Sequence, residues 1–197
     1  VVLSNERSAD VGNLDAHGRA VNHQWSKSSE FEGRLRAELR RAVSAELDVF
    51  SLLRPLSELA IAERFARSFR WDAAFSSCNR NFPLDGPRTA RWCGDCPKCR
   101  FVFLGLAPFM QPEALRAIFG SDLLDDPGQC DGFASLLALE RPRPFECVGE
   151  ADEARAHQSL ANGWFASAAQ VRNGGRRGRH SLSFPRSGPR RRRRRAR

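Results

Sequence analysis

Apolar and charged residues alternate in the first third of the chain at the spacing of an α-helix. The apolar positions are Phe31, Leu35, Leu39, Val43 and Leu47. This spacing predicts one amphipathic helix. Proline is well suited to the first turn of a helix, so Pro55 predicts the start of a second one, with an inner stripe of Leu59, Ala62, Phe65, Ala66 and Phe69.

The rest of the pattern predicts shorter elements. Helices are expected near 98–106, after Pro112, around 133–139 and at 151–157. The strings VVLS and DVFSLLRP predict brief extended segments, and the polar stretch NERSADVGNLDAHGRAVNHQWSKSS between them has no helical periodicity. This order predicts a mostly helical α/β protein. Because two strands are too few to build a sheet, we expect the chain to be the latter part of a larger fold.

Positive charge is concentrated at the C-terminal end of the chain. The formal net charge is +9, but twelve arginines fall between Arg172 and Arg197, and removing them leaves residues 1–171 at −3. The basic end has few apolar residues to bury, so we predict a folded portion over residues 1–157 and a disordered arginine-rich tail over residues 158–197. The tail has three interpretations: a polyanion-binding segment, the product of a shifted reading frame, or an ordinary solvated linker.

The chain has no segment that predicts export or membrane insertion. Its longest apolar run, FVFLGLAPFM, covers ten residues, and VVLSNERSAD lacks the regions of a signal peptide. We therefore expect a cytoplasmic protein, in which clustered cysteines bind metal or perform chemistry more often than they form disulfides.

Four of the six cysteines lie close together, at Cys78, Cys93, Cys96 and Cys99. A Cys-x2-Cys turn brings two thiolates onto one cation, and Gly94 provides the backbone freedom that such a turn needs. The pattern favours a structural Zn²⁺ that fixes a loop to the start of the following helix. An iron–sulfur cluster and metal-free thiols are the alternatives. The other two cysteines, Cys130 and Cys147, are expected to be buried rather than to bind metal.

Several strings together resemble a known family. The order Ser-Cys, an insert and then Cys-Gly-x-Cys-x-x-Cys is similar to the zinc-binding segment of the deazaguanine synthases, members of the PP-loop ATP-pyrophosphatase superfamily. A closer resemblance, to the UDP-N-acetylmuramoyl-L-alanyl-L-glutamate epimerase family of the MurL type, covers most of residues 1–157. It is carried by LSNERSAD, VNHQWSKSSEFE, FSLLRPLSELAIAERFA, SCNRNF, RWCGDCPKCRFVFLGLAPF, IFGSDLLDD and RPFECVGEADEARA.

This resemblance implies a specific reaction. Members of the family use ATP and Mg²⁺ to invert the terminal L-glutamate of a UDP-linked muramoyl dipeptide in peptidoglycan precursor synthesis, releasing AMP and pyrophosphate. The chemistry is reasonable because deprotonating Cα beside a carboxylate would place two negative charges together. Adenylation removes that obstacle, and a base can then take the proton before reprotonation from the other face.

Loops after the predicted strands contain the candidate site residues. The catalytic candidates are His23 and Lys27, and the candidates for substrate or nucleotide binding are Asn5, Glu6, Arg7, Ser8, Asn22, Gln24, Ser26, Arg54 and Glu58. Each has a plainer interpretation. Glu6 and Arg7 could pair with each other or face solvent, His23 could serve as a hydrogen-bonding residue, and Ser57 or Glu58 could cap a helix.

One expected motif does not occur in the sequence. ATP pyrophosphatases hold phosphates in a Ser-Gly-Gly-x-Asp-Ser loop, and this string is absent. We therefore expect a C-terminal portion of the epimerase, inactive alone. Two further hypotheses are a PP-loop enzyme that modifies a nucleobase or tRNA and a zinc-stapled nucleic-acid-binding module. The acidic charge of residues 1–171 weighs against the first, and the apolar helix after the cysteines weighs against the second.

Overall fold

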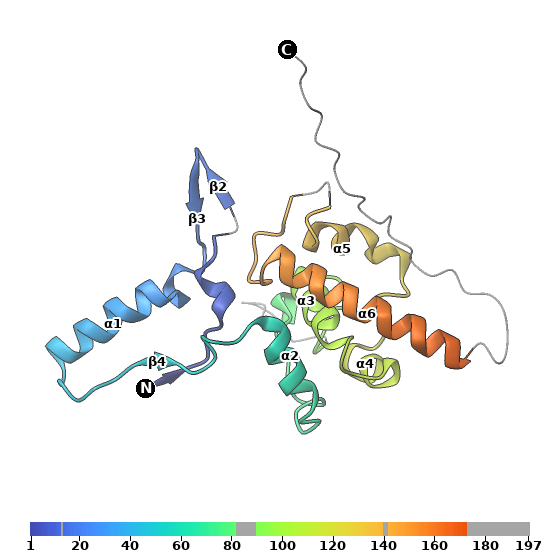
Figure 1. Ribbon diagram of the computed structural model, residues 1–197, viewed down its shortest axis with the longest axis horizontal. Helices are drawn as coiled ribbons and strands as arrows, with labels where there is room; N and C mark the ends of the chain where they lie inside the picture. The colour runs from blue at the N-terminus through green and yellow to red at the C-terminus, as the bar shows by residue number, and fades with distance from the viewer. Residues whose placement is uncertain (13, 82–89, 140–141, 173–197) are drawn as a thin grey trace, which may run out of the picture.

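The computed structural model describes residues 1–12, 14–81, 90–139 and 142–172. Strand β1 (Val2–Leu3) pairs in parallel with β4 (Phe50–Ser51), and helix α1 (Ser29–Ala42) lies in the connection between them (Figure 1). Parallel neighbours need a long crossover, and a helix is its usual content. Both predicted extended segments are thus confirmed as strands.

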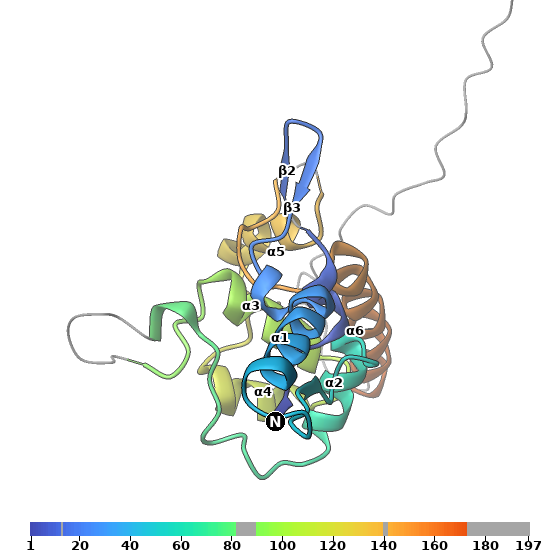
Figure 2. The same cartoon turned by 90° about the vertical axis from the view of Figure 1, so that its left-hand side faces the viewer.

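The polar stretch between β1 and α1 contains an element that was not predicted. Strands β2 (Leu14–Ala16) and β3 (Arg19–Val21) form an antiparallel hairpin, which projects from the body in Figures 1 and 2. His17 and Gly18 both have positive φ, 54° and 76°, as the tight turn of such a hairpin requires. Asp15 Oδ1 accepts a hydrogen bond from Gly18 N at 2.9 Å. The expectation of an irregular loop here was wrong.

Both N-terminal helices are shorter than predicted. Ser28 caps α1 by accepting a hydrogen bond from Phe31 N, but α1 ends at Ala42. Val43 is 69% exposed, so the apolar pattern does not continue in the helix to Leu47. Val43 and Leu47 therefore do not extend the helical stripe.

Helix α2 (Glu58–Ala66) begins three positions after Pro55, because the Ser57 side chain caps it by accepting from Ala60 N. Phe69 was assigned to its inner stripe, but it lies beyond the helix end with φ 50° and is 70% exposed. The capping interpretation of Ser57 is thus confirmed, and the assignment of Phe69 was wrong.

Within the described residues, four α-helices follow Cys96. They are α3 (Pro97–Leu106), α4 (Pro112–Phe119), α5 (Cys130–Leu136) and α6 (Ala151–Arg172). Helices α3 and α4 match the prediction, whereas α5 begins three residues early. Helix α6 passes the predicted end at His157 by many residues, so 158–172 belong to a helix rather than to the predicted tail. The rest of that tail, 173–197, lies outside the described residues.

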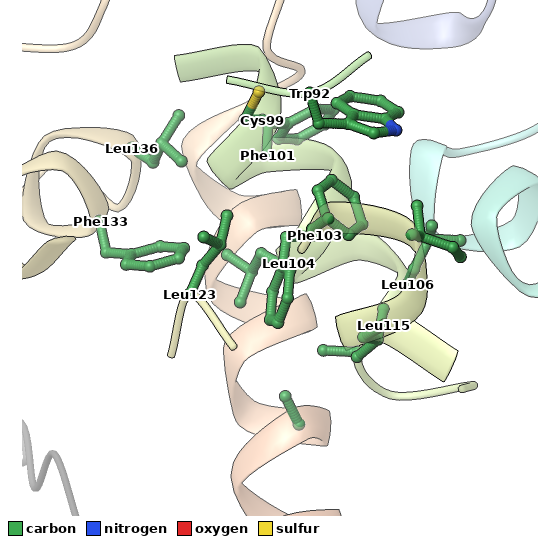
Figure 3. Close-up of a cluster of buried hydrophobic side chains, with 14 of the residues drawn as sticks. Trp92, Cys99, Phe101, Phe103, Leu104, Leu106, Leu115, Leu123, Phe133 and Leu136 are labelled. Carbon is green, nitrogen blue, oxygen red and sulfur yellow. The ribbon is translucent and has the colours of Figure 1, made fainter. Parts of the chain in front are cut away.

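The core is built around α3. Helices α2, α4, α5 and α6 pack against it, and its side chains Phe101, Phe103, Leu104 and Leu106 are buried (Figure 3). Trp92 stacks on Phe119 with ring centroids 4.7 Å apart, which adds aromatic packing to the apolar burial. This rigid core holds the start of α3, where the cysteines lie.

The observed architecture is a mostly helical α/β structure with two small sheets, which confirms the predicted fold class at that level. Within the described ranges, no helix has the length and apolar character needed to cross a membrane.

Candidate functional site

Four cysteine sulfurs gather where the loop segments meet the first turn of α3. The Sγ atoms of Cys78, Cys93, Cys96 and Cys99 all lie within 4.8 Å of one another. Individual separations are 4.0 Å for Cys78–Cys96, 3.7 Å for Cys93–Cys99 and 3.4 Å for Cys96–Cys99. None of the four forms a disulfide.

These separations fit a tetrahedral cation. A Zn–S bond of ~2.3 Å implies sulfurs about 3.8 Å apart in a regular tetrahedron. Backbone N–H groups also point at the sulfurs: Cys93 N donates to Cys78 Sγ, Asp95 N to Cys93 Sγ and Cys99 N to Cys96 Sγ, each at 3.4 Å. Donors of this kind stabilise thiolates, so the predicted four-cysteine set can hold a metal.

The acid–base chemistry of the thiols also calls for a cation. Burial raises the pKa of both Cys93 and Cys99. Burial opposes ionisation of Cys96 as well, but hydrogen bonds from the Cys99 backbone and thiol hold its pKa below the usual value. Burial thus favours the protonated thiols of Cys93 and Cys99 when no cation is bound, and metal binding would release protons.

Ion pairs and hydrogen bonds brace the loops that supply these ligands. Asp95 accepts from Arg80 at 3.1 Å and also pairs with Arg100. Ser76 Oγ donates to Arg91 O at 2.6 Å and accepts from Cys78 N at 3.3 Å. The cysteine segment is consequently fixed on both sides of the cluster.

A cleft adjoins the four cysteines and shares their segments. It has a volume of about 590 Å³, and the residues that line it are His23, Lys27, Ser76, Ser77, Asn79, Lys98, Phe145, Glu146 and Cys147. Ser77 and Asn79 flank Cys78, and Lys98 lies between Cys96 and Cys99 in the sequence. The metal site is therefore placed to hold one wall of a cleft of ligand-binding size.

The two predicted catalytic candidates meet a cysteine in this cleft. His23 Nε2 lies 3.5 Å from Cys147 Sγ, and Lys27 Nζ donates to the same sulfur at 3.7 Å. Burial, followed by the charges of Lys27 and Lys98, lowers the pKa of His23. Its imidazole is thus favoured in the neutral form, which can accept a proton.

The other candidates of this loop serve its own structure. Asn22 Nδ2 donates to Ala9 O at 2.8 Å, and Asn22 Oδ1 accepts from the backbone N of Gln24 at the same distance. Gln24 is buried, whereas Ser26 is exposed on the 3₁₀ turn Trp25–Lys27. Their roles in ligand binding stay predictions.

Arg54 lies at the centre of a hydrogen-bond network. Its guanidinium donates to Glu6 O at 2.9 Å and Lys27 O at 2.7 Å, and it pairs with Glu32 at 3.2 Å. These bonds tie together three loops of the N-terminal part, and one of those loops carries the cleft lysine. Nearby, Asn5 Nδ2 donates to Ser51 Oγ at 3.1 Å, which links the two predicted strands.

Carboxylates gather at the start of α2. Arg7 pairs with Glu153 at 3.5 Å, and Glu153 Oε1 accepts from Glu58 N at 3.2 Å. Ser8 Oγ donates to Glu58 Oε1 at 3.4 Å. Burial, together with the charges of Glu6 and Glu153, raises the pKa of Glu58 to about 7. Arg7 thus pairs with a residue from α6 rather than with Glu6, while its side chain stays 59% exposed to solvent.

Sequence reasoning missed part of the cleft. Cys147 was expected to be buried, but it is half-buried and lines the cleft, and Cys130 is half-buried as well. Lys98, Asn79 and Glu146 were not proposed. One signal was available for the first of these: the chain has only two lysines, Lys27 and Lys98, and both line this cleft.

The fold and cluster define the class: a mostly helical α/β protein with a four-cysteine cluster able to hold a metal beside an open cleft lined by two lysines. Comparison with known families identifies it further. Residues 74–172 match the MurL C-terminal domain and residues 1–52 match the MurL N-terminal domain. The chain belongs to the MurL epimerase family.

Similar proteins share one name, UDP-N-acetyl-alpha-D-muramoyl-L-alanyl-L-glutamate epimerase. The one from Xanthomonas oryzae pv. oryzae is 55% identical over 161 residues, which is 81% of this chain. The one from Salinispora tropica is 52% identical over 167 residues, which is 83% of this chain. The chain spans about a third, 36%, of the length of each of these relatives. No solved structure matches it significantly.

Proposed function

We propose that this chain forms the substrate side of an ATP-dependent epimerase that inverts the terminal L-glutamate of UDP-N-acetylmuramoyl-L-alanyl-L-glutamate. The observation that carries the proposal is the cleft, where His23 and Lys27 contact Cys147 and Lys98 lines the wall beside the four-cysteine cluster. The similar proteins are named for this reaction. Because the substrate is a cytoplasmic precursor of peptidoglycan, the cytoplasm is the proposed location.

The cleft suits such a substrate for electrostatic reasons. The glutamate to be inverted carries carboxylates, and the nucleotide part carries phosphates, so ammonium groups are favourable partners. Lys27 and Lys98 supply two of them from segments far apart in the sequence. Inversion also needs groups that remove and return the proton at Cα, and imidazole and thiol groups can do both.

Cofactors follow from the same proposal. ATP and Mg²⁺ are the proposed cofactors, and they would activate the carboxylate. Zn²⁺ is the proposed occupant of the four-cysteine site, because its sulfur spacing matches a tetrahedral ion. A zinc ion held by these four cysteines would have four protein ligands and no position for substrate, so its role would be to support the structure.

The test uses the full-length parent protein. It is incubated with the L-glutamate-terminated precursor, ATP and Mg²⁺, and AMP and the configuration of the glutamate are measured. Conversion to D-glutamate that requires ATP supports the proposal, and the 197-residue chain alone is expected to give no product. ATP-dependent modification of a nucleobase or tRNA with unchanged L-glutamate would contradict it.

A further inference from the structure

Cys147 is held in the cleft by its neighbours in sequence and in space. Phe145 stacks on His23 with ring centroids 4.8 Å apart, and Val148 is buried. Arg143 donates to Gly149 O at 2.8 Å, so a side chain–backbone hydrogen bond joins the two ends of segment 143–149. Gly149 has φ 61°, and a side chain there would come within 2.7 Å of Phe101. The sulfur is therefore presented to the cleft by a segment that has little freedom.

Two groups of complementary chemistry contact the sulfur of Cys147. The imidazole of His23 lies 3.5 Å from Cys147 Sγ, and the ammonium of Lys27 donates to it from 3.7 Å. A cysteine beside a histidine and a cation is the arrangement by which proteins prepare a thiol for proton transfer or nucleophilic attack. The second non-cluster cysteine, Cys130, begins α5 and is not among the residues that line the cleft.

The geometry points to Cys147 as the catalytic residue that exchanges the proton at the glutamate Cα, with His23 and Lys27 as its positioning residues. This inference rests on the proposed epimerase function and names the acid–base residue of that site. Glu146 is a weaker candidate because it already accepts a hydrogen bond from Asn79. Lys98 lies over the ring of Phe101, 5.8 Å from its centroid.

The proton transfer balances without any further reagent. The thiol proton of Cys147 first moves to His23 Nε2, which leaves a thiolate and an imidazolium. The Cα–H bond of the activated glutamate then breaks, its proton forms a new S–H bond, and its electron pair enters the enolate of the activated carboxyl group. Water in the open cleft protonates the opposite face and becomes hydroxide, and the imidazolium returns its proton to that hydroxide, which restores water. Hydrolysis of the activated carboxyl group then releases AMP and the D-glutamate carboxylate.

The neutral state of His23 supports this sequence of events. Burial, Lys27 and Lys98 together lower its pKa, so the ring is neutral and its Nε2 is available as an acceptor for the thiol 3.5 Å away. Lys27 then faces the thiolate that forms. The charges of both lysines thus favour the unprotonated imidazole before the transfer, and Lys27 favours the negative sulfur after it.

The test separates activation from inversion in the full-length enzyme. Cys147→Ser should lower the rate of D-glutamate formation by at least about 100-fold, whereas AMP release should stay within about threefold of wild type. Run in D₂O, the wild-type enzyme should place deuterium at Cα of the product, and the variant should not. Cys130→Ser is the matched control and should behave as wild type in both assays.

The outcomes distinguish a failure of the proposed function from a failure of the role assigned to Cys147. A wild-type enzyme that makes neither AMP nor D-glutamate overturns the proposed function itself. A wild-type enzyme that inverts glutamate, together with a Cys147→Ser variant that inverts it equally fast, overturns only the role of Cys147. If the variant does not fold, alkylation of the wild-type enzyme replaces it: modification of Cys147, mapped by mass spectrometry, should abolish inversion, and retained inversion would refute the inference.

The positioning roles have their own measurement. In the 197-residue chain, Cys147 should react with iodoacetamide faster than Cys130. His23→Gln should slow the reaction of Cys147 by about tenfold and leave that of Cys130 unchanged. Equal rates at Cys147 with and without the imidazole would contradict the pairing.

Discussion

His157 should make the stability of the protein depend on pH. Its side chain is 1% exposed, packs against Gly105 and the ring of Phe101, and has no hydrogen-bond partner for either ring nitrogen among the described residues. Burial lowers its pKa to about 4, from 6.5. The folded protein therefore holds this imidazole neutral at a pH where the unfolded chain protonates it.

The size of the effect follows from the shift in pKa. Between pH 6.5 and pH 4 the unfolded state binds more protons than the folded state, so stability falls as the pH is lowered through this range. A single histidine with these two pKa values lowers the free energy of unfolding by about 2 kcal/mol between pH 7 and pH 5.

Glu58 acts in the opposite direction over nearly the same range. Its pKa is raised to about 7, so the folded state binds its proton first, and stability increases as the pH falls from 7 toward 4.5. The expected gain between pH 7 and pH 5 is also about 2 kcal/mol. The two effects offset each other in the wild-type chain, which should show little net pH dependence from this pair.

Two variants separate the opposing effects of His157 and Glu58 on the free energy of unfolding. Free energies of unfolding are measured by urea denaturation at pH 7 and pH 5 for wild type, His157→Leu and Glu58→Gln. Relative to wild type, His157→Leu should gain about 2 kcal/mol on moving to pH 5, and Glu58→Gln should lose about as much. General destabilisation would move both in one direction. A His157→Leu variant that follows the wild-type pH dependence would refute the assignment of a buried neutral imidazole.

Three further changes test other parts of the structure. Purified protein should contain about one zinc ion per chain, and Cys96→Ser should lose it and unfold at lower temperature, as elemental analysis and thermal unfolding would show; metal-free or iron-containing wild-type protein would contradict this. Gly149→Ala should destabilise by at least about 1 kcal/mol because its side chain meets Phe101 at positive φ, whereas Gly33→Ala, in open space on α1, should stabilise by ~0.5 kcal/mol; equal effects in urea denaturation would contradict the packing. Ser57→Ala should cost about 1 kcal/mol in the same assay through loss of the α2 cap, and an unchanged midpoint would count against it.

The sequence predicts the helical part well because apolar periodicity decides it. Helix α3 was predicted almost to the residue, since proline at its start and a continuous apolar face leave few alternatives. The β2–β3 hairpin was missed because its His17–Gly18 turn lacks the usual Asn-Gly or Asp-Gly signal and its strands have three residues each. The true end of α1 depends on packing that local periodicity does not contain.

The candidate site also has one part that the sequence predicts and one part that it does not. The four-cysteine set was predictable because its ligands share one short segment with regular spacing. The cleft was not, because His23 and Cys147 are 124 positions apart and only tertiary packing brings them together. Arg54 shows what charge alone leaves out: its guanidinium is engaged by backbone carbonyls and Glu32, and its role in substrate binding stays a prediction.

The central claim is that the cleft with the two lysines is where the epimerase converts its substrate. The most direct test compares the rates of D-glutamate formation by full-length wild type, Lys27→Ala, Lys98→Ala and the surface control Arg67→Ala, all with confirmed metal content. Loss of either charge-assisted contact should lower the rate by roughly 30- to 1000-fold, and the control should match wild type. Wild-type rates in both lysine variants would contradict the claim and place the site elsewhere.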